Sequence, residues 1–214
     1  VALVRHLFAF VATCGLASAE VTRVEILARS DIGASGYEKI AGRLHFAVDP
    51  GEPRNRVIAD IALAPRNAKG QVEFSSDLYI LKPKDPAAGN GAAFVEISNR
   101  GGRGLLGMFN RGGARDPQTA AELGDGFLMQ QGFTLVTVGW EFDVPRTPGL
   151  MRIEVPVATE GGKPITGVVR ARLLADTRTV ELRSTDMAAY PILNATGEGA
   201  GLAILRSLTD PVRT

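Results

Sequence analysis

Residues 93–113, AFVEISNRGGRGLLGMFNRGG, contain the pattern in this chain that is most suggestive of chemistry. An apolar run ends at Ser98, and Asn99, Arg100, Gly101 and Gly102 follow it. Because glycine has no Cβ, it lets the backbone approach a ligand closely. Three interpretations are open: the segment cradles a phosphate, supplies N–H groups to an oxyanion, or forms a tight turn after a strand.

The phosphate interpretation rests on residues 102–107, GRGLLG, which match the G-x-G-x-x-G pattern of dinucleotide-binding folds. That function also needs a helix starting at the glycines and an acidic residue about 20 positions further on. Residues 110–113, NRGG, are expected to interrupt such a helix, and the next strand ends only near Glu141. With His6 and His45 as the only histidines, the sequence predicts neither a cofactor nor a metal site.

The oxyanion interpretation fits the neighbourhood of the segment better. In α/β-hydrolases, a loop after the third strand supplies one backbone N–H group to the oxyanion of the transition state. Asn99, Arg100, Gly101 and Gly102 end a predicted strand, and a helix and a parallel strand are predicted to follow them. A plain turn explains the same spacing, so both interpretations stay open.

The elements that position this segment begin with a β-rich part over residues 20–83. Alternating apolar and polar residues predict strands at 20–29, 40–48 and 71–83, and an apolar run at 57–65 ends at a proline. The first of these strands is expected at a sheet edge, because neither of its faces is clearly apolar. This part of the chain therefore has the pattern of an antiparallel meander.

Residues 92–140 have a different pattern, which predicts a strand–helix–strand unit. Strands are expected at 92–98 and 133–140, joined by a helix of about fifteen residues that Asp116 caps and Gly132 ends. Such a unit has parallel strands and a right-handed crossover. Residues 150–184 then return to a β-rich pattern, with strands predicted at 150–157, 165–174 and 177–184. The predicted fold class is α/β.

Residues 1–19, VALVRHLFAFVATCGLASA, have the layout of a secretory signal peptide that is cleaved after Ala19. A buried N-terminal helix is the alternative. Cleavage would remove the only cysteine, Cys14, and would lower the formal net charge from +1 to zero by removing Arg5. The sequence thus predicts a secreted or periplasmic protein that binds neither nucleic acid nor, once the signal is removed, a membrane.

The chain resembles the secreted "alpha/beta hydrolase domain" proteins of bacteria, which are serine hydrolases of esterase type. The stretches that carry the resemblance are residues 37–50, 60–83, 94–102, 126–144, 152–158 and 164–171. They cover roughly residues 21–195 in the order of the family. The resemblance implies a serine nucleophile on a G-x-S-x-G elbow, followed by an acid and a histidine, and a small-molecule ester as substrate.

The sequence departs from that family pattern at the catalytic residues. No G-x-S-x-G motif occurs, and no histidine follows His45. We therefore expect residues 20–214 to be the N-terminal portion of an α/β-hydrolase domain, with an incomplete sheet, no catalytic residue and no activity alone. The N–H groups near Gly101 and Gly102 would stabilise the oxyanion in the complete protein. An unpaired strand edge at 133–140 would make the isolated chain poorly soluble or oligomeric.

A non-catalytic secreted binding module is the alternative function. In that case residues 20–83 and 150–184 would form a self-contained β-rich domain, and the strand–helix–strand unit would be an accessory. The two functions differ in whether Trp140, Glu141 and Asp143 line a pocket with residues 99–104, because ligands gather at the carboxyl ends of parallel strands. These three residues would otherwise be core and solvated loop.

Overall fold

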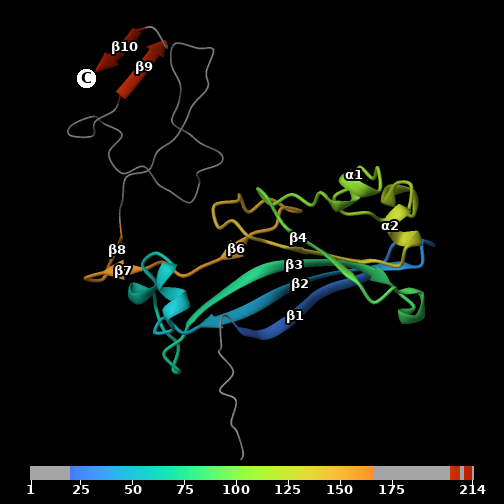
Figure 1. Ribbon diagram of the computed structural model, residues 1–214, viewed down its shortest axis with the longest axis horizontal. Coiled ribbons are helices and arrows are strands. Elements are labelled where there is room, and N and C mark those ends of the chain that lie inside the picture. The colour runs from blue at the N-terminus through green and yellow to red at the C-terminus, as the bar shows by residue number, and fades with distance from the viewer. Residues whose placement is uncertain (1–19, 166–202, 208–209, 214) are drawn as a thin grey trace, which may run out of the picture.

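The computed structural model describes residues 20–165, 203–207 and 210–213 (Figure 1). They form a mixed β-rich domain, built on a six-stranded, mostly antiparallel sheet with one parallel pair and a few short helices. Its strands are β1 (Glu20–Asp31), β2 (Tyr37–Val48), β3 (Val72–Pro83), β4 (Ala93–Ile97), β5 (Thr134–Val138) and β6 (Ile153–Glu154). Two hairpins lie outside that sheet, β7 (Thr159–Glu160) with β8 (Lys163–Pro164), and β9 (Ala203–Ser207) with β10 (Asp210–Arg213).

The β-rich N-terminal part forms the meander that the alternating pattern predicts. β1 pairs antiparallel with β2, and β2 pairs antiparallel with β3 over its full length, from Tyr37 opposite Pro83 to Val48 opposite Val72. β1 lies at the sheet edge, as expected. Between β2 and β3 the chain forms the short 3-10 helices η1 (Pro53–Val57) and η2 (Ile61–Leu63), so the apolar run at 57–65 adds no strand.

The parallel pair is confirmed, but its place in the sheet differs from the prediction. β4 and β5 run parallel, and the strand order is β1-β2-β3-β5-β4. β5 therefore pairs on both sides, with β3 and with β4, and the expectation of an open edge at residues 133–140 was wrong. After β3 the chain forms β4 two strand positions away in the sheet, and β5 then occupies the position between β3 and β4. The edge strand on this side is β4.

The predicted fifteen-residue helix in the crossover was also wrong. In its place lie the 3-10 helix η4 (Ala121–Leu123) and a single α-helical turn, α2 (Phe127–Gln130), and α1 (Leu105–Phe109) precedes them. Gly124 and Gly126 have φ values of 85° and 77°, which a right-handed helix cannot contain. Asp116 does not cap a helix, because its carboxylate accepts hydrogen bonds from Lys39 and Tyr79.

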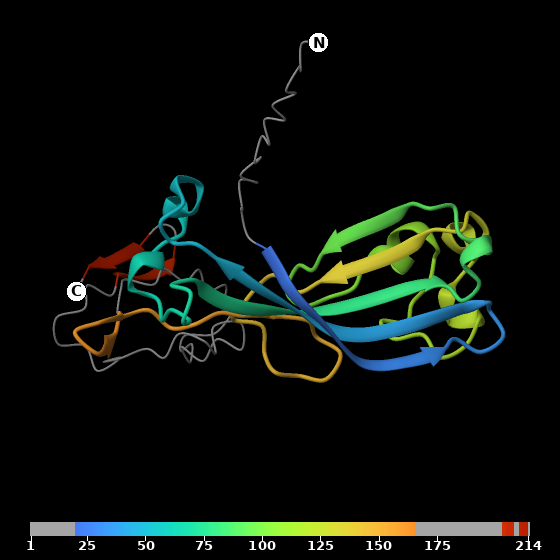
Figure 2. The ribbon, with the colours of Figure 1, turned by 90° about the horizontal axis from the view of Figure 1, so that it is seen from below.

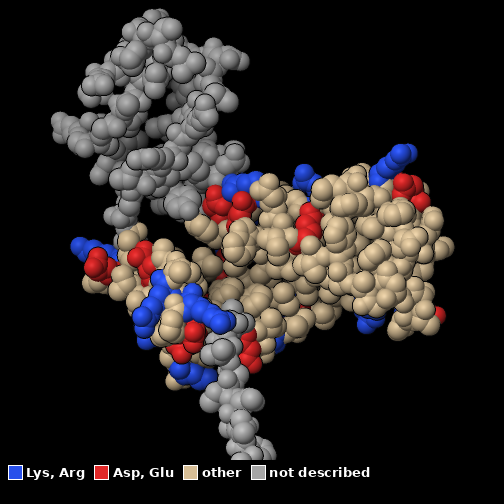
Figure 3. All heavy atoms as spheres, in the orientation of Figure 1, with Lys and Arg blue, Asp and Glu red and all other residues tan. Residues whose placement is uncertain are grey.

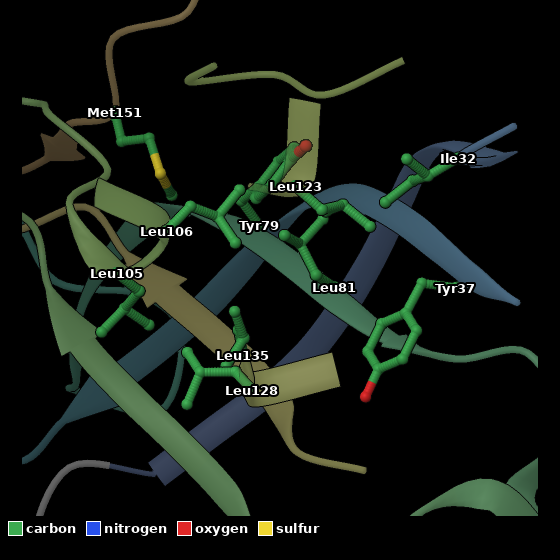
Figure 4. Packing of buried hydrophobic residues seen from close by; sticks show 10 residues of the cluster. All are labelled: Ile32, Tyr37, Tyr79, Leu81, Leu105, Leu106, Leu123, Leu128, Leu135 and Met151. Carbon is green, nitrogen blue, oxygen red and sulfur yellow. The ribbon is translucent and has the colours of Figure 1, made fainter. Parts of the chain in front are cut away.

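One face of the sheet is covered by this crossover and holds the main hydrophobic core (Figure 4). Tyr79 and Leu81 of β3 and Leu135 of β5 point to this face. The buried residues that pack in the same cluster from outside the sheet include Ile32, Leu105, Leu106, Leu123, Leu128 and Met151. Because side chains of a strand alternate between its faces, Tyr79 and Leu81 are separated by Ile80, which points to the opposite face.

The opposite face is also apolar across β2, β3, β5 and β4. Two cross-strand rows run over it, Ile40–Ile80–Val136–Val95 and Leu78–Val138–Ile97. Figure 2 views the sheet from this side, with the crossover helices behind the strands. Val95 and Ile97 are each 56% exposed. Within the described ranges this face lacks the helical cover of the other, and we call it the open face.

The C-terminal β-rich prediction is only partly within the described residues. Of residues 150–157, β6 alone is a strand, and it pairs with Ser75 and Ser76 of β3. The strands predicted at 165–174 and 177–184 lie outside the described residues, apart from Ile165, as does the predicted signal peptide at 1–19. No helix in the described part of the chain is long and apolar enough to cross a membrane.

Candidate functional site

The segment after β4 is a tight turn. The N–H group of Gly102 donates to the carbonyl oxygen of Asn99 (3.1 Å), and the two central residues, Arg100 and Gly101, have φ values of 49° and 78°. Two central residues with positive φ define a type I′ turn. The hydroxyl of the buried Ser98 donates to the carbonyl oxygen of Gly102 (2.8 Å) and braces the turn from the end of the strand.

No residue with a Cβ atom fits at position 101 of this turn. A Cβ atom there would lie 2.7 Å from Cγ1 of Val144 and 3.0 Å from Cβ of Leu150, which is closer than atoms can pack. Its carbonyl oxygen accepts a hydrogen bond from the N–H group of Met151 (3.0 Å). The N–H group of the buried Gly101 donates to no residue in the described part of the chain. A buried N–H group without a partner is uncommon in proteins.

Arg100 connects the turn to the residues that follow β5. Its N–H group donates to Oε2 of Glu141 (2.6 Å), and its Nη1 atom lies 3.0 Å from Oδ1 of Asp143. Glu141 and Asp143 therefore contact the loop through Arg100. Trp140 is 64% exposed and does not reach the core.

An open hollow of about 310 Å³ lies at the carboxyl end of β4. It is lined by Glu96, Asn99, Gly102, Arg103, Gly104 and Arg115. A second, smaller pocket of about 20 Å³ shares Glu96, Arg103 and Arg115 with this lining. Its other lining residues include Tyr79, Leu105, Leu135 and Thr137. Asn99 and Gly102 of the predicted site thus line the hollow, whereas Arg100, Gly101, Trp140, Glu141 and Asp143 do not.

Arg103 is held in a fixed orientation beside the hollow. Its guanidinium carbon lies 4.1 Å from the centre of the Tyr79 ring, in a cation–π contact. Its Nε atom donates to the carbonyl oxygen of Arg115 (2.7 Å). The two contacts define the plane of the guanidinium group.

A buried polar group lies beneath Arg103. The Tyr79 hydroxyl donates to Oδ1 of Asp116 (2.8 Å), and Nζ of Lys39 donates to the same oxygen (2.9 Å). Burial, and then the bond to Asp116, raise the pKa of Tyr79, so its hydroxyl stays protonated. Burial raises the pKa of Asp116, but the hydrogen bonds from Lys39 and Tyr79 outweigh it and hold that pKa below its usual value.

Glu96 supplies the carboxylate of the hollow. Its Oε1 atom accepts from the N–H group of Gly104 (2.7 Å), and its Oε2 atom accepts from the Thr137 hydroxyl (3.2 Å). Both oxygens are thus engaged within the protein. Glu96, Arg103 and Arg115 were not singled out from the sequence, although strand alternation alone would have placed Glu96 on the same face as Phe94.

Comparison of the chain with protein-family models, with curated proteins and with solved structures finds no match. The site must therefore be interpreted from its own geometry. His45, the histidine of β2, contacts Arg23 and Glu25 of β1, and no serine hydroxyl is among its hydrogen-bond partners in the described residues. No cluster of side chains suited to a metal ion occurs in the part of the chain that the structure describes.

Proposed function

We propose that this chain is the N-terminal part of a secreted α/β-hydrolase that acts on carboxylic esters. The sheet would then be an incomplete α/β-hydrolase sheet, with an antiparallel entry region and the first two parallel strands. The nucleophilic serine and its histidine would come from outside the described residues.

The observation that carries this proposal is the open face. Sheets of parallel strands are covered on both faces and apolar on both sides, whereas antiparallel sheets can leave one face in water, so this expectation applies to the parallel pair β4–β5 alone. Toward the open face β4 and β5 are apolar, and toward the crossover they combine apolar residues with the polar Glu96 and Thr137. On the open face Ile40 and Leu78 are buried, but Val95 and Ile97 at the β4 edge are exposed. This exposed apolar edge supports the proposal that the sheet belongs to a larger α/β layer structure.

The free edge of β4 supports the same conclusion. The N–H group of Ser98 donates to Val138, and the carbonyl oxygen of Ala92 accepts from Thr134. Because a parallel ladder engages alternate residues of a strand, Val95 and Ile97 direct their N–H groups away from β5. A further parallel strand would pair at this edge.

The hollow is the proposed substrate site. It lies at the carboxyl end of a parallel strand, which is where ligands bind in open α/β sheets. Of the N–H groups in the turn, that of Gly101 is left for an oxyanion, since those of Arg100 and Gly102 are bonded to Glu141 and Asn99. Gly101 adjoins the hollow through Gly102 but does not line it, so this role requires the rest of the complete protein to bring the oxyanion to the turn. Loss of one such donor typically lowers the rate about 10²–10³-fold.

The experiment compares two proteins: the chain given by residues 20–214, and the product of its complete reading frame in the source. Each is assayed for hydrolysis of p-nitrophenyl acetate and for labelling by a fluorophosphonate. We expect turnover and a labelled serine beyond residue 214 only in the second protein. A complete product that is neither active nor labelled would contradict the proposal, as would inhibitor-sensitive turnover by residues 20–214 alone.

A non-catalytic binding module is the second candidate. Two observations favour it: the hollow has no nucleophile among its lining residues, and Trp140, Glu141 and Asp143 do not line it. In the structure, however, the strand–helix–strand unit is not separate from the β-rich part of the chain. β5 pairs with β3, and Leu105 and Leu128 of the crossover share a core with Tyr79 and Leu81. Ligand binding without turnover in the complete product would favour this candidate.

A further inference from the structure

We infer that the hollow after β4 binds the carboxylate group of a small, singly charged organic anion, between the side chains of Arg103 and Arg115. This inference rests on the proposed function, because it takes the hollow to be the substrate site. It specifies the substrate further, as an ester that carries a free carboxylate.

Arg103 is prepared to bind a planar anion. Its stacking on Tyr79 and its Nε bond to Arg115 leave the two Nη atoms, which donate to no residue in the described ranges. A guanidinium group binds a carboxylate through two parallel hydrogen bonds, and it loses less entropy when its orientation is already fixed. The free side of Arg103 therefore matches the shape of a carboxylate.

Arg115 contributes a second cation at the same place. Its carbonyl oxygen holds Arg103, and its side chain lines the hollow without an ion pair to any described residue. Other arginines of the described residues, such as Arg29, Arg43 and Arg146, have acidic partners, so the cation of Arg115 is among those left for a ligand. Charged side chains are sparse over the part of the surface formed by β4, α1 and α2, where much of the view is uncharged (Figure 3).

The nearby carboxylates do not neutralise these two arginines. Both oxygens of Glu96 are bonded to Gly104 and Thr137, and Asp116 is paired with Lys39. Two guanidinium groups and one carboxylate line the hollow, so its lining carries one net positive charge. That single surplus charge matches a carboxylate monoanion, whereas a phosphate dianion would bring a second charge that the lining leaves uncompensated and that costs more to desolvate.

The test is calorimetric titration of the 214-residue chain with sodium benzoate, with benzamide as the neutral analogue and inorganic phosphate as the dianionic one. We expect saturable benzoate binding with a Kd on the order of 1 mM, which two or so charge-assisted hydrogen bonds can supply. Benzamide should not bind, and phosphate should bind more weakly than benzoate.

Three variants locate the site. Arg103→Gln and Arg115→Gln should each weaken benzoate binding about tenfold or more, the effect of losing a hydrogen bond to a charged group. Arg115→Gln removes no contact that the fold uses, so it remains informative if Arg103→Gln fails to fold. Arg111→Gln is the matched control, since this exposed arginine of the same segment does not line the hollow and should bind benzoate normally.

The inference is overturned if benzoate does not bind saturably, if both hollow variants bind it as well as the unaltered chain, or if phosphate binds more tightly. None of these measurements depends on hydrolysis. An active complete enzyme with no benzoate site would refute this inference alone, and a benzoate site in an inactive complete product would refute the proposed function alone.

Discussion

The two faces of this sheet are made by the same strands, yet they differ in how far burial extends toward the edge strand β4. On the covered face, Leu81 and Leu135 are each 3% exposed beneath the crossover between β4 and β5. On the open face, burial falls off toward the edge: Ile40 and Leu78 of the central strands are 8% and 6% exposed, whereas Val95 of β4 is 56% exposed although it is just as apolar. Sequence periodicity therefore determines which residues share a face, while burial depends on whether another part of the chain covers it.

This difference connects local structure to function. The crossover covers one face and, through the turn at Gly101 and the arginines of the hollow, also builds the candidate site at the end of β4. The open face has apolar side chains but no site of its own in the described residues. The hydrolase proposal takes its exposed edge to be an interior surface of a larger sheet.

The largest effect should come from shortening a side chain on the covered face. Leu135→Ala should lower the free energy of unfolding by about 2–5 kcal/mol, because the deletion leaves a cavity in a packed core. Val95→Ala on the open face should change it by no more than about 0.5 kcal/mol. Urea unfolding of both variants checks the contrast, and equal losses would contradict the distinction between the faces.

The second effect concerns the charged group that borders the open face beside Ile40 and Ile80. Glu38 accepts hydrogen bonds from Arg29 (2.7 Å) and lies 3.0 Å from Nζ of Lys82. The bond from Arg29 is the main reason that the pKa of Glu38 falls to about 2. Because the folded-state pKa is lowered, this contribution is present above the unfolded value, near 4.5, and is lost as the pH falls toward 2.

The size of that contribution is at most about 3 kcal/mol, since one pKa unit corresponds to about 1.4 kcal/mol and solvent at the exposed Arg29 reduces it. Urea unfolding between pH 5 and 2 should therefore show a loss of stability that Glu38→Gln largely removes. If the free energy of unfolding of Glu38→Gln falls as steeply between pH 5 and 2, other carboxylates cause the loss of stability.

A third variant tests the turn that joins the covered face to the site. Gly101→Ala should lower the free energy of unfolding by about 1–3 kcal/mol, because Ala is strained at a φ of 78° and its Cβ would meet Val144. Gly113→Ala is the control, since a Cβ there meets nothing within 4 Å. Thermal melting distinguishes them; equal melting temperatures would show that the turn is not held as described.

The smallest change in stability should come from making the open face polar. The double variant Val95→Lys/Ile97→Lys should unfold within about 1 kcal/mol of the unaltered chain, because both positions are exposed. It should nevertheless bind less of the dye ANS and self-associate less, because charged residues on an edge strand oppose strand pairing. If the double variant binds as much ANS and sediments in the same way as the unaltered chain, the open face is not the surface that binds the dye and self-associates.

Much of the fold could be predicted from residue patterns alone. Alternation located β1, β2 and β3, and the β-branched run 134–138 located β5, because a strand's faces are recorded in every second residue. The strand order could not be predicted in this way. The residue pattern within β5 is the same whether this strand lies at the sheet edge or between β3 and β4.

The crossover and the site were harder to predict for a physical reason. Leu123 and Phe127 have helical spacing, but Gly124 and Gly126 adopt positive φ, so the segment folds into two short turns instead of one helix. Of the candidate residues, those in the turn were found through their glycines. Arg103 and Arg115 were missed because their role depends on contacts across the fold, with Tyr79 and with each other.

The most direct test of the central claim is amide hydrogen exchange at the edge of β4. Val95 and Ile97 should exchange quickly in the 214-residue chain, because their N–H groups face away from β5. In the product of the complete reading frame they should be protected to the level of β5, since a further strand would pair with them. Equally fast exchange in both proteins would contradict the claim that this sheet continues beyond β4.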